Sequence, residues 1–165
     1  MSEHHHHTEQ HFQQSEIIKD IVIGMADGLT VPFALAAGLS GVVDSNGIII
    51  TAGIAEICAG SIAMGLGGYL AGRTEIEHYN SELKREYDEI VTHYETEKRE
   101  VREIFAEYGL SEQSQHLIVD EMAKNEDKWV EFMMRYELGL EKPDERRASK
   151  SALNIGISYI IGGII

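Results

Sequence analysis

Positive charge is missing from a long part of this sequence. The chain has 165 residues and 14 Lys and Arg residues, but none of these basic residues lies between Ile21 and Gly72. The same stretch holds only three acidic residues, which are Asp27, Asp44 and Glu56. An uncharged stretch of this length would expose more apolar surface than a soluble monomer tolerates. The lack of charge therefore excludes a single soluble domain.

Cysteine and basic residues are also scarce, and this narrows the possible functions. The only cysteine is Cys58, which excludes an internal disulfide framework. Basic residues are outnumbered by 28 acidic residues, and the net charge at pH 7 is -14. Phosphate would repel such a chain, so no nucleic-acid partner is expected.

Two apolar runs are each long enough to cross a membrane as a helix. A bilayer core about 30 Å thick needs roughly 20 helical residues. The runs cover Ile21–Val43 and Ile48–Gly72, and residues 44–47 (DSNG) between them have the composition of a turn. The sequence therefore predicts an antiparallel hairpin of two membrane helices. The alternative is a buried helical hairpin in a soluble protein.

Glycines spaced four residues apart favour the membrane hairpin over that alternative. Gly24 with Gly28, and Gly68 with Gly72, are pairs of small residues one helical turn apart. Such pairs let helix backbones approach closely in lipid, where no hydrophobic force drives helices together.

The charges that flank the hairpin predict its orientation. Lys19 precedes the first run and Arg73 follows the second, whereas the turn has no positive charge. The positive-inside bias then predicts that both outer ends, and the acidic segment 73–150, are cytoplasmic. A third uncharged run, 151–165, would reach only about 22 Å as a helix. The chain is therefore expected to be a fragment that ends inside a third span of a longer membrane protein.

Two carboxylates lie inside the predicted spans. Asp27 and Glu56 would each cost about 2.5 to 3.5 kcal/mol in the membrane, so they are expected to face protein, water or an ion. Pro32 leaves the Gly28 carbonyl without a helical donor, which frees a backbone oxygen near Asp27.

The second span repeats its unusual residues at helical spacing. Glu56, Gly60 and Met64 follow at i, i+4 and i+8, which places them on one helix face with a glycine gap. A carboxylate and a thioether suit a borderline-soft cation such as Fe(II). The alternative is that Met64 is packing and that Glu56 pairs with a neighbouring hydroxyl.

The acidic segment has the residues of a helical bundle. From Thr74 to Tyr108 there is no Gly or Pro, and residues 92–95 (THYE) have the form of a capping box, which predicts two helices joined near residue 93. Gly109 ends the second of these helices, and Ser111 can cap a third. Gly139 and Pro143 then stop the segment that ends in MMRYEL.

Paired glutamates make this bundle a candidate metal-binding domain. Glu86 and Glu89 stand at i, i+3, and Glu97 and Glu100 repeat that spacing on the next helix, as in carboxylate-bridged metal sites of helical bundles. Like charges at this spacing repel, so a cation would stabilise them. The last helix adds Met133, Met134 and Glu137. The alternatives are a solvated acidic face and, for the methionines, a plain core position.

Together these features predict an all-α membrane protein. Its parts are a polar His-rich segment (1–16), two transmembrane helices (within 17–72), an acidic cytoplasmic metal-binding domain (73–150) and the start of a third transmembrane helix (151–165). The run His4–His7 can chelate metal or be the remnant of a tag, and no site is assigned to it.

Several long strings of the sequence resemble the vacuolar iron transporter family. These strings cover nearly the whole chain from about Ser15 onward, at Ala26–Gly41, Thr51–Tyr79, Leu83–Ile90, Trp129–Asp144 and Ser151–Ile165. The resemblance implies a homodimeric secondary transporter, not an enzyme, with five membrane helices per subunit and no cofactor. It implies export of Fe(II), and often Mn(II), from the cytosol in exchange for protons, across a vacuole-type or cell membrane.

The resemblance also assigns roles to residues. The translocation path falls on Asp27, Glu56 and Met64. The cytoplasmic metal site falls on Glu86, Glu89, Glu97, Glu100, Met133, Met134 and Glu137.

Two rival functions use the same glutamates. One is a membrane-anchored ferritin-like di-iron oxidase, and the other is a metal-sequestering scaffold. The Glu-x-x-His pairs expected of the oxidase are missing after the second span, apart from Glu75 with His78.

Overall fold

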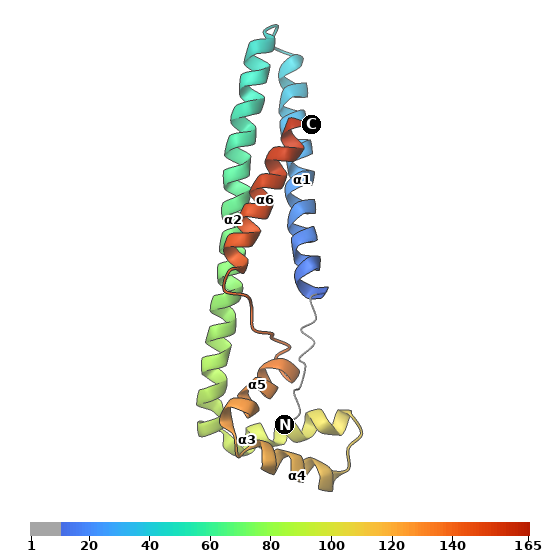
Figure 1. Cartoon of the computed structure of the whole chain (residues 1–165), viewed down its shortest axis with the longest axis vertical. Helices are drawn as coiled ribbons and strands as arrows, with labels where there is room; N and C mark the ends of the chain where they lie inside the picture. The colour runs from blue at the N-terminus through green and yellow to red at the C-terminus, as the bar shows by residue number, and fades with distance from the viewer. Residues whose placement is uncertain (1–10) are drawn as a thin grey trace, which may run out of the picture. The chain divides into compact units, whose positions relative to one another are not determined.

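The computed structural model describes residues 11–165, with side chains from residue 16 onward, and the segment His4–His7 lies outside the described residues. Six helices and no strand occur in this part of the chain, which confirms the predicted all-α fold (Figure 1). The helices are α1 (His11–Ser40), α2 (Asn46–Thr92), α3 (Tyr94–Glu107), α4 (Glu112–Met122), α5 (Glu126–Tyr136) and α6 (Arg147–Ile164).

The chain divides into two compact units. The first, which we call the apolar unit, consists of the chain up to Arg73 together with Glu145–Ile165. The second, the acidic unit, is Thr74–Asp144. Helix α2 contributes its first half to the apolar unit and its second half to the acidic unit.

The two long helices of the apolar unit have the properties of membrane spans. Helices α1, from Glu16, and α2 are both long and apolar enough to cross a bilayer, and only 17% and 0% of their most apolar stretches is buried in the structure. The core helix of a soluble protein would be mostly buried. Large side chains such as Phe33 and Ile62 are instead 73% and 71% exposed. The protein is an all-α membrane protein, and the soluble hairpin is rejected.

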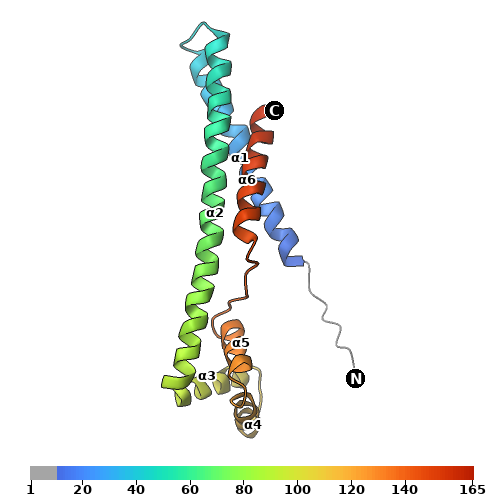
Figure 2. The same ribbon diagram turned by 60° about the vertical axis from the view of Figure 1, so that its left-hand side comes forward.

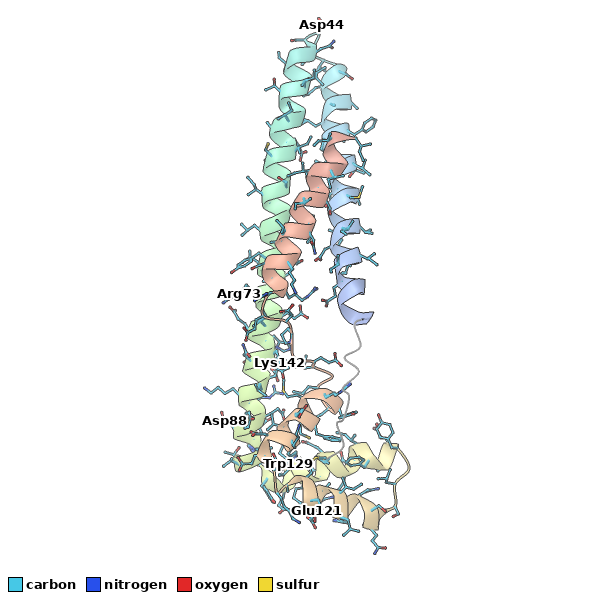
Figure 3. All side chains as sticks on the ribbon, in the orientation of Figure 1. Asp44, Arg73, Asp88, Glu121, Trp129 and Lys142 are labelled. Carbon is cyan, nitrogen blue, oxygen red and sulfur yellow. The ribbon has the colours of Figure 1, made fainter. Side chains whose placement is uncertain are left out.

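The turn between these helices lies slightly earlier than predicted. Helix α1 ends at Ser40 rather than Val43, because the backbone N–H groups of Val42 and Val43 both donate to the Leu39 carbonyl, at 3.0 and 2.9 Å, and close the last turn. Asp44 lies in the connection (Figure 3). Asn46 and Gly47, predicted as turn residues, already belong to α2.

Helix α6 packs on both glycine pairs. Figures 1 and 2 both show α6 beside α1 and α2. A Cβ atom added at Gly72 of α2 would lie 2.6 Å from Ala148 Cα, and one at Gly24 of α1 would lie 3.1 Å from the Ile155 carbonyl carbon. Gly28 and Gly68 lie equally close to α6. The predicted close approach of helices at these glycines is confirmed, and its partner is α6.

Polar contacts hold the beginnings of α1 and α6 together. Arg147 Nη1 donates to Glu16 Oε2 at 2.5 Å, and Ser151 Oγ donates to Asp20 Oδ1 at 3.0 Å. Asp20 is buried, with 5% of its surface exposed. A buried carboxylate is stable only with a hydrogen-bond donor. These contacts therefore orient α6 on α1, in addition to the packing of small residues.

The acidic unit has its own hydrophobic core. Its buried members come from α2, α3, α4 and α5, and they are Ile90, Val101, Val119, Trp129, Val130, Met133 and Met134. The rings of Tyr94 and Trp129 pack in a T-shaped arrangement, with their centroids 5.3 Å apart. This core fixes the end of α2 against the three short helices.

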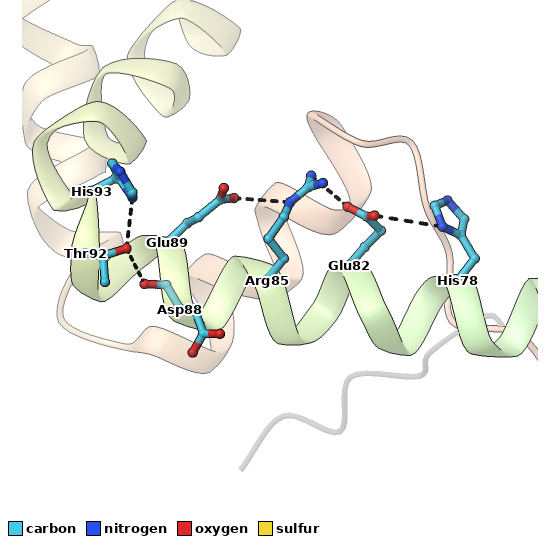
Figure 4. A network of polar contacts seen from close by, with 7 residues as sticks. All are labelled: His78, Glu82, Arg85, Asp88, Glu89, Thr92 and His93. Carbon is cyan, nitrogen blue, oxygen red and sulfur yellow. Dashed lines mark hydrogen bonds and ion pairs between the residues drawn. The ribbon is translucent and has the colours of Figure 1, made fainter.

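The break between α2 and α3 falls at His93, as predicted, but its predicted capping box does not form. His93 is the N-cap residue of α3 and makes no side-chain capping bond. Thr92 Oγ1 instead donates to the Asp88 carbonyl at 2.8 Å and contacts His93 Nδ1, which closes the end of α2 (Figure 4). The N-cap position of α3 is therefore occupied by His93 rather than Thr92, and a His side chain has no oxygen that could cap the helix.

The remaining helix ends follow ordinary capping chemistry. Ser111 Oγ accepts from the Ser114 amide, as predicted, and Asn125 Oδ1 accepts from the Lys128 amide. Asn125 begins a separate helix, α5, which the sequence reasoning had not separated from α4. Gly109 and Gly139 have φ values of 80° and 63°, a conformation that glycine adopts most easily and that ends the helices before them.

Candidate metal centre

Three carboxylates from three parts of the acidic unit meet at one point. Glu86 lies on α2, Glu97 lies on α3, and Glu137 is the C-cap residue of α5. One carboxylate oxygen of each lies within 4.8 Å of those of the other two. The break at His93 makes this possible, because it turns the chain so that glutamates eleven positions apart face each other. We call these three residues the carboxylate cluster.

Two members of the carboxylate cluster are buried and incompletely satisfied. Glu86 is 1% exposed and Glu97 is 4% exposed, whereas Glu137 is exposed. Glu86 Oε2 and Glu97 Oε2 have no hydrogen-bond partner among the described residues. Buried polar atoms are normally paired, so two orphaned oxygens in one cluster call for a proton or a cation.

The electrostatics of the cluster agree with its geometry. Burial raises the pKa of the Glu86 carboxyl to about 7, and the charges of Glu137 and Glu89 add to the rise. Burial likewise raises the pKa of Glu97 to about 7, with Glu100 as the largest charge contribution. The pKa of Glu137 is raised as well, by desolvation and by Glu100. Near neutral pH the carboxyl groups of the cluster can therefore bind either protons or a cation.

The other two predicted glutamates surround the cluster. Glu89 Oε2 lies 3.4 Å from Arg85 Nε, and Arg85 also pairs with Glu82 at 2.7 Å (Figure 4). Glu100 is half-buried on α3 and acts on the cluster through its charge. Spacing alone had predicted two equal pairs, but tertiary packing brings one member of each pair to the centre and adds Glu137.

Met133 and Met134 lie in the hydrophobic core of the acidic unit, at 0% and 2% exposure. Burial of this kind serves packing directly, and a role for the sulfur atoms as ligands stays a prediction. Oxygen donors dominate the cluster, and such a donor set suits hard divalent cations such as Mg(II), Ca(II) and Mn(II).

The predicted membrane carboxylates lie in the apolar unit. Glu56 accepts a hydrogen bond from the Tyr159 hydroxyl on α6, and the donor and acceptor oxygens are 2.6 Å apart. The other oxygen, Glu56 Oε2, is buried and has no partner among the described residues. Asp27 on α1 and Met64 on α2 are half-buried. The gap predicted at Gly60 is filled by the Tyr159 ring, because a Cβ atom there would lie 2.6 Å from Tyr159 Cε1.

Similarity to known proteins shows to which family this chain belongs. The sequence profile of the VIT family matches residues 18–165. This chain belongs to the VIT family. It is 58% identical over 160 residues to "Vacuolar iron transporter 1" of Arabidopsis thaliana, an alignment that covers 97% of this chain and 64% of that protein.

More distant members match along the same region. Identity is 52% over 162 residues to "Vacuolar iron transporter 1" of Oryza sativa subsp. japonica, with 98% of this chain and 64% of that protein covered. It is 38% over 151 residues to "Protein CCC1" of Saccharomyces cerevisiae, with 90% and 47% covered. The resemblance seen in the sequence is confirmed. The VIT-family chain described here spans slightly less than two thirds of the length of these plant relatives.

In this VIT-family chain, sequence reasoning missed two polar residues of the third uncharged run. Tyr159 reaches Glu56, and Ser151 reaches Asp20. The sequence did contain a signal for these contacts. Each polar side chain in an otherwise apolar helix needs a partner, and the acidic residues of α1 and α2 are the available acceptors.

Proposed function

We propose that this protein is a secondary transporter that exports Fe(II), and also Mn(II), from the cytosol in exchange for protons. Family membership supports the proposal, since the plant relatives are named as iron transporters. The observation that carries it is the carboxylate cluster. In this cluster Glu86 and Glu97 are both buried, and each keeps an oxygen with no partner among the residues that the structure describes. Such a site stabilises a divalent cation directly.

In this proposal the two units have separate tasks. The acidic segment 73–150 is the cytoplasmic domain that collects metal. Its ligands are Glu86, Glu97 and Glu137, assisted by Glu89, Glu100, Met133 and Met134. Asp27, Glu56 and Met64 then carry the ion across a vacuole-type or cell membrane, in a homodimer. Lys19 and Arg73, which flank the uncharged hairpin, support this orientation.

Proton coupling follows from the chemistry of carboxylates in a desolvated place. A buried carboxyl group holds a proton when no cation is present and releases it when a cation binds. The same group therefore binds metal or a proton, but not both. Exchange of one for the other needs no further cofactor.

Metal binding by the 165-residue chain tests the role of the carboxylate cluster. Calorimetric titration of the detergent-solubilised chain with Mn(II) is expected to show binding that weakens about a hundredfold in the Glu86→Gln, Glu97→Gln double variant. Gln keeps the shape and removes the charge. The matched control is Glu95→Gln, Glu107→Gln, which removes two exposed charges from α3 and should bind like the wild type. Equal binding by both double variants would reduce the cluster to a structural feature.

Transport by the complete protein separates the three functions. Reconstituted in proteoliposomes with a pH gradient, it should move Fe(II) into vesicles that contain an Fe(II) indicator. Binding without flux would support the scaffold, and O2 consumption that depends on Fe(II) would support the oxidase.

A further inference from the structure

The two carboxylate oxygens of Glu56 have different surroundings. The Tyr159 hydroxyl donates to Oε1, and the two oxygens are 2.6 Å apart. Oε2 is buried and has no hydrogen-bond partner in the described part of the chain. A carboxylate with one tethered oxygen has a fixed rotamer, so the direction in which the second oxygen points is fixed too.

Tyr159 is itself fixed by two glycines on two helices. It is 2% exposed. Its ring covers Gly60 of α2, where a Cβ atom would lie 2.6 Å from Cε1, and its backbone covers Gly28 of α1, where a Cβ atom would lie 2.9 Å from Tyr159 Cα. Any side chain at either glycine would move the phenol. The site is thus shaped around this ring on both sides.

Both membrane carboxylates lie next to these glycines. Asp27 directly precedes Gly28 on α1, and Glu56 lies one helical turn before Gly60 on α2. Tyr159 is therefore the group of α6 that stands between the two helices that carry the acids.

We propose that Tyr159 is a positioning residue of the transport path, whose hydroxyl fixes Glu56 Oε1 so that Oε2 is presented to the metal ion or proton. This inference rests on the proposed function, because it assumes that Glu56 takes part in transport. It differs from a packing role, in which the ring would matter and the hydroxyl would not. The variant Tyr159→Phe separates the two roles because it keeps the ring and removes only the donor.

Infrared spectroscopy of the 165-residue chain tests the hydrogen bond without transport. The carboxyl band of Glu56 is identified by its loss in Glu56→Gln. We expect this band to shift in Tyr159→Phe and to stay in place in Tyr69→Phe, a control that removes the hydroxyl of a more exposed tyrosine on α2. An unshifted band in Tyr159→Phe would overturn the proposal.

Flux measurements on the complete protein test the consequence. Loss of a hydrogen bond to a charged group changes an equilibrium by about tenfold or more, so Tyr159→Phe should raise the KM for Fe(II) about tenfold, with normal assembly. Tyr69→Phe should leave it unchanged. If Glu56→Gln transports normally, the proposed function fails. If Glu56→Gln is inactive but Tyr159→Phe has wild-type KM and rate, the positioning role alone fails.

Discussion

The two units hold glutamates with a buried carboxylate oxygen in opposite ways. In the acidic unit, Glu86 and Glu97 face one another with Glu137, so the cluster gathers negative charge at one point. In the apolar unit, Glu56 accepts a hydrogen bond from a neutral donor, the Tyr159 hydroxyl. Both units contain buried carboxylate oxygens that have no hydrogen-bond partner within residues 11–165.

This difference fits two distinct tasks. Several carboxylates around one point bind a divalent ion more tightly than one carboxylate does, which suits the collection of metal. A single oriented carboxylate binds more weakly and can pass an ion onward. We therefore expect substitutions in the apolar unit to change flux, and substitutions in the acidic unit to change affinity and stability.

The largest effect is expected from Asp27→Asn in the complete protein. Asn still forms hydrogen bonds and costs less to insert in a membrane, so a structural role would leave transport intact. If Asp27 carries metal or protons, the variant should lose Fe(II) flux into proteoliposomes completely while it keeps expression and Mn(II) binding by the acidic unit. Asp44→Asn, in the connection between α1 and α2, is the control. Wild-type flux in Asp27→Asn would contradict the expectation that substitutions in the apolar unit change flux.

The pH dependence of stability is the next largest effect, and it concerns only the acidic unit. A carboxyl whose pKa rises from 4.5 to about 7 on folding binds its proton more tightly in the folded state. Folding is therefore favoured at low pH, and the unfolding free energy of the metal-free chain should fall between pH 4.5 and 7, by up to about 3 kcal/mol per group. The fluorescence of Trp129, the only tryptophan, reports unfolding of this unit.

The variant Glu86→Gln, Glu97→Gln sharpens that measurement. Gln cannot ionise, so the stability of the metal-free double variant should be nearly flat over the same pH range and higher than that of the wild type at pH 8. A Mn(II) concentration that saturates the wild type should stabilise the wild type at pH 8 and should stabilise the double variant much less. A wild type that becomes more stable as the pH rises would contradict the raised pKa values.

Gly60→Ala is expected to lower Fe(II) flux about tenfold, on the same scale as the loss of a hydrogen bond to a charged group. The added methyl group would overlap the Tyr159 ring, which must move away from Glu56. Gly67→Ala, on the same helix, is the control because a Cβ atom there meets nothing within 4 Å. Equal flux in the two variants would show that the ring position does not matter for transport.

The sequence predicted the elements of this fold well where periodicity and composition act locally. The two apolar helices, the break at residue 93 and the helix ends at Gly109 and Gly139 are all confirmed. Local patterns were less reliable for the exact residues at which helices begin. Thr92 fits the pattern of a capping box, yet its hydroxyl bonds backward to Asp88. Asn125 is a good N-cap residue, but polar residues around it masked the boundary between α4 and α5.

The candidate sites were less accessible to sequence reasoning because they are tertiary. Spacing placed Glu86 and Glu89 on one face, but it does not show that Glu86 turns inward to meet Glu97 while Glu89 contacts Arg85. Tyr159 lies 103 positions from Glu56, and an aromatic residue in an apolar run usually indicates packing. Only the assembled helices bring these groups together.

The smallest effect is expected from Met64→Leu, which tests whether the path distinguishes metals. Leu keeps the volume of Met and removes the sulfur, so assembly should be normal. Fe(II) is softer than Mn(II) and gains more from a thioether. The variant should therefore lower Fe(II) flux about threefold and leave Mn(II) flux unchanged. Met25→Leu, at a half-buried position of α1, is the matched control. Equal losses for both ions would indicate that Met64 acts through packing, and the path would then rest on carboxylates alone.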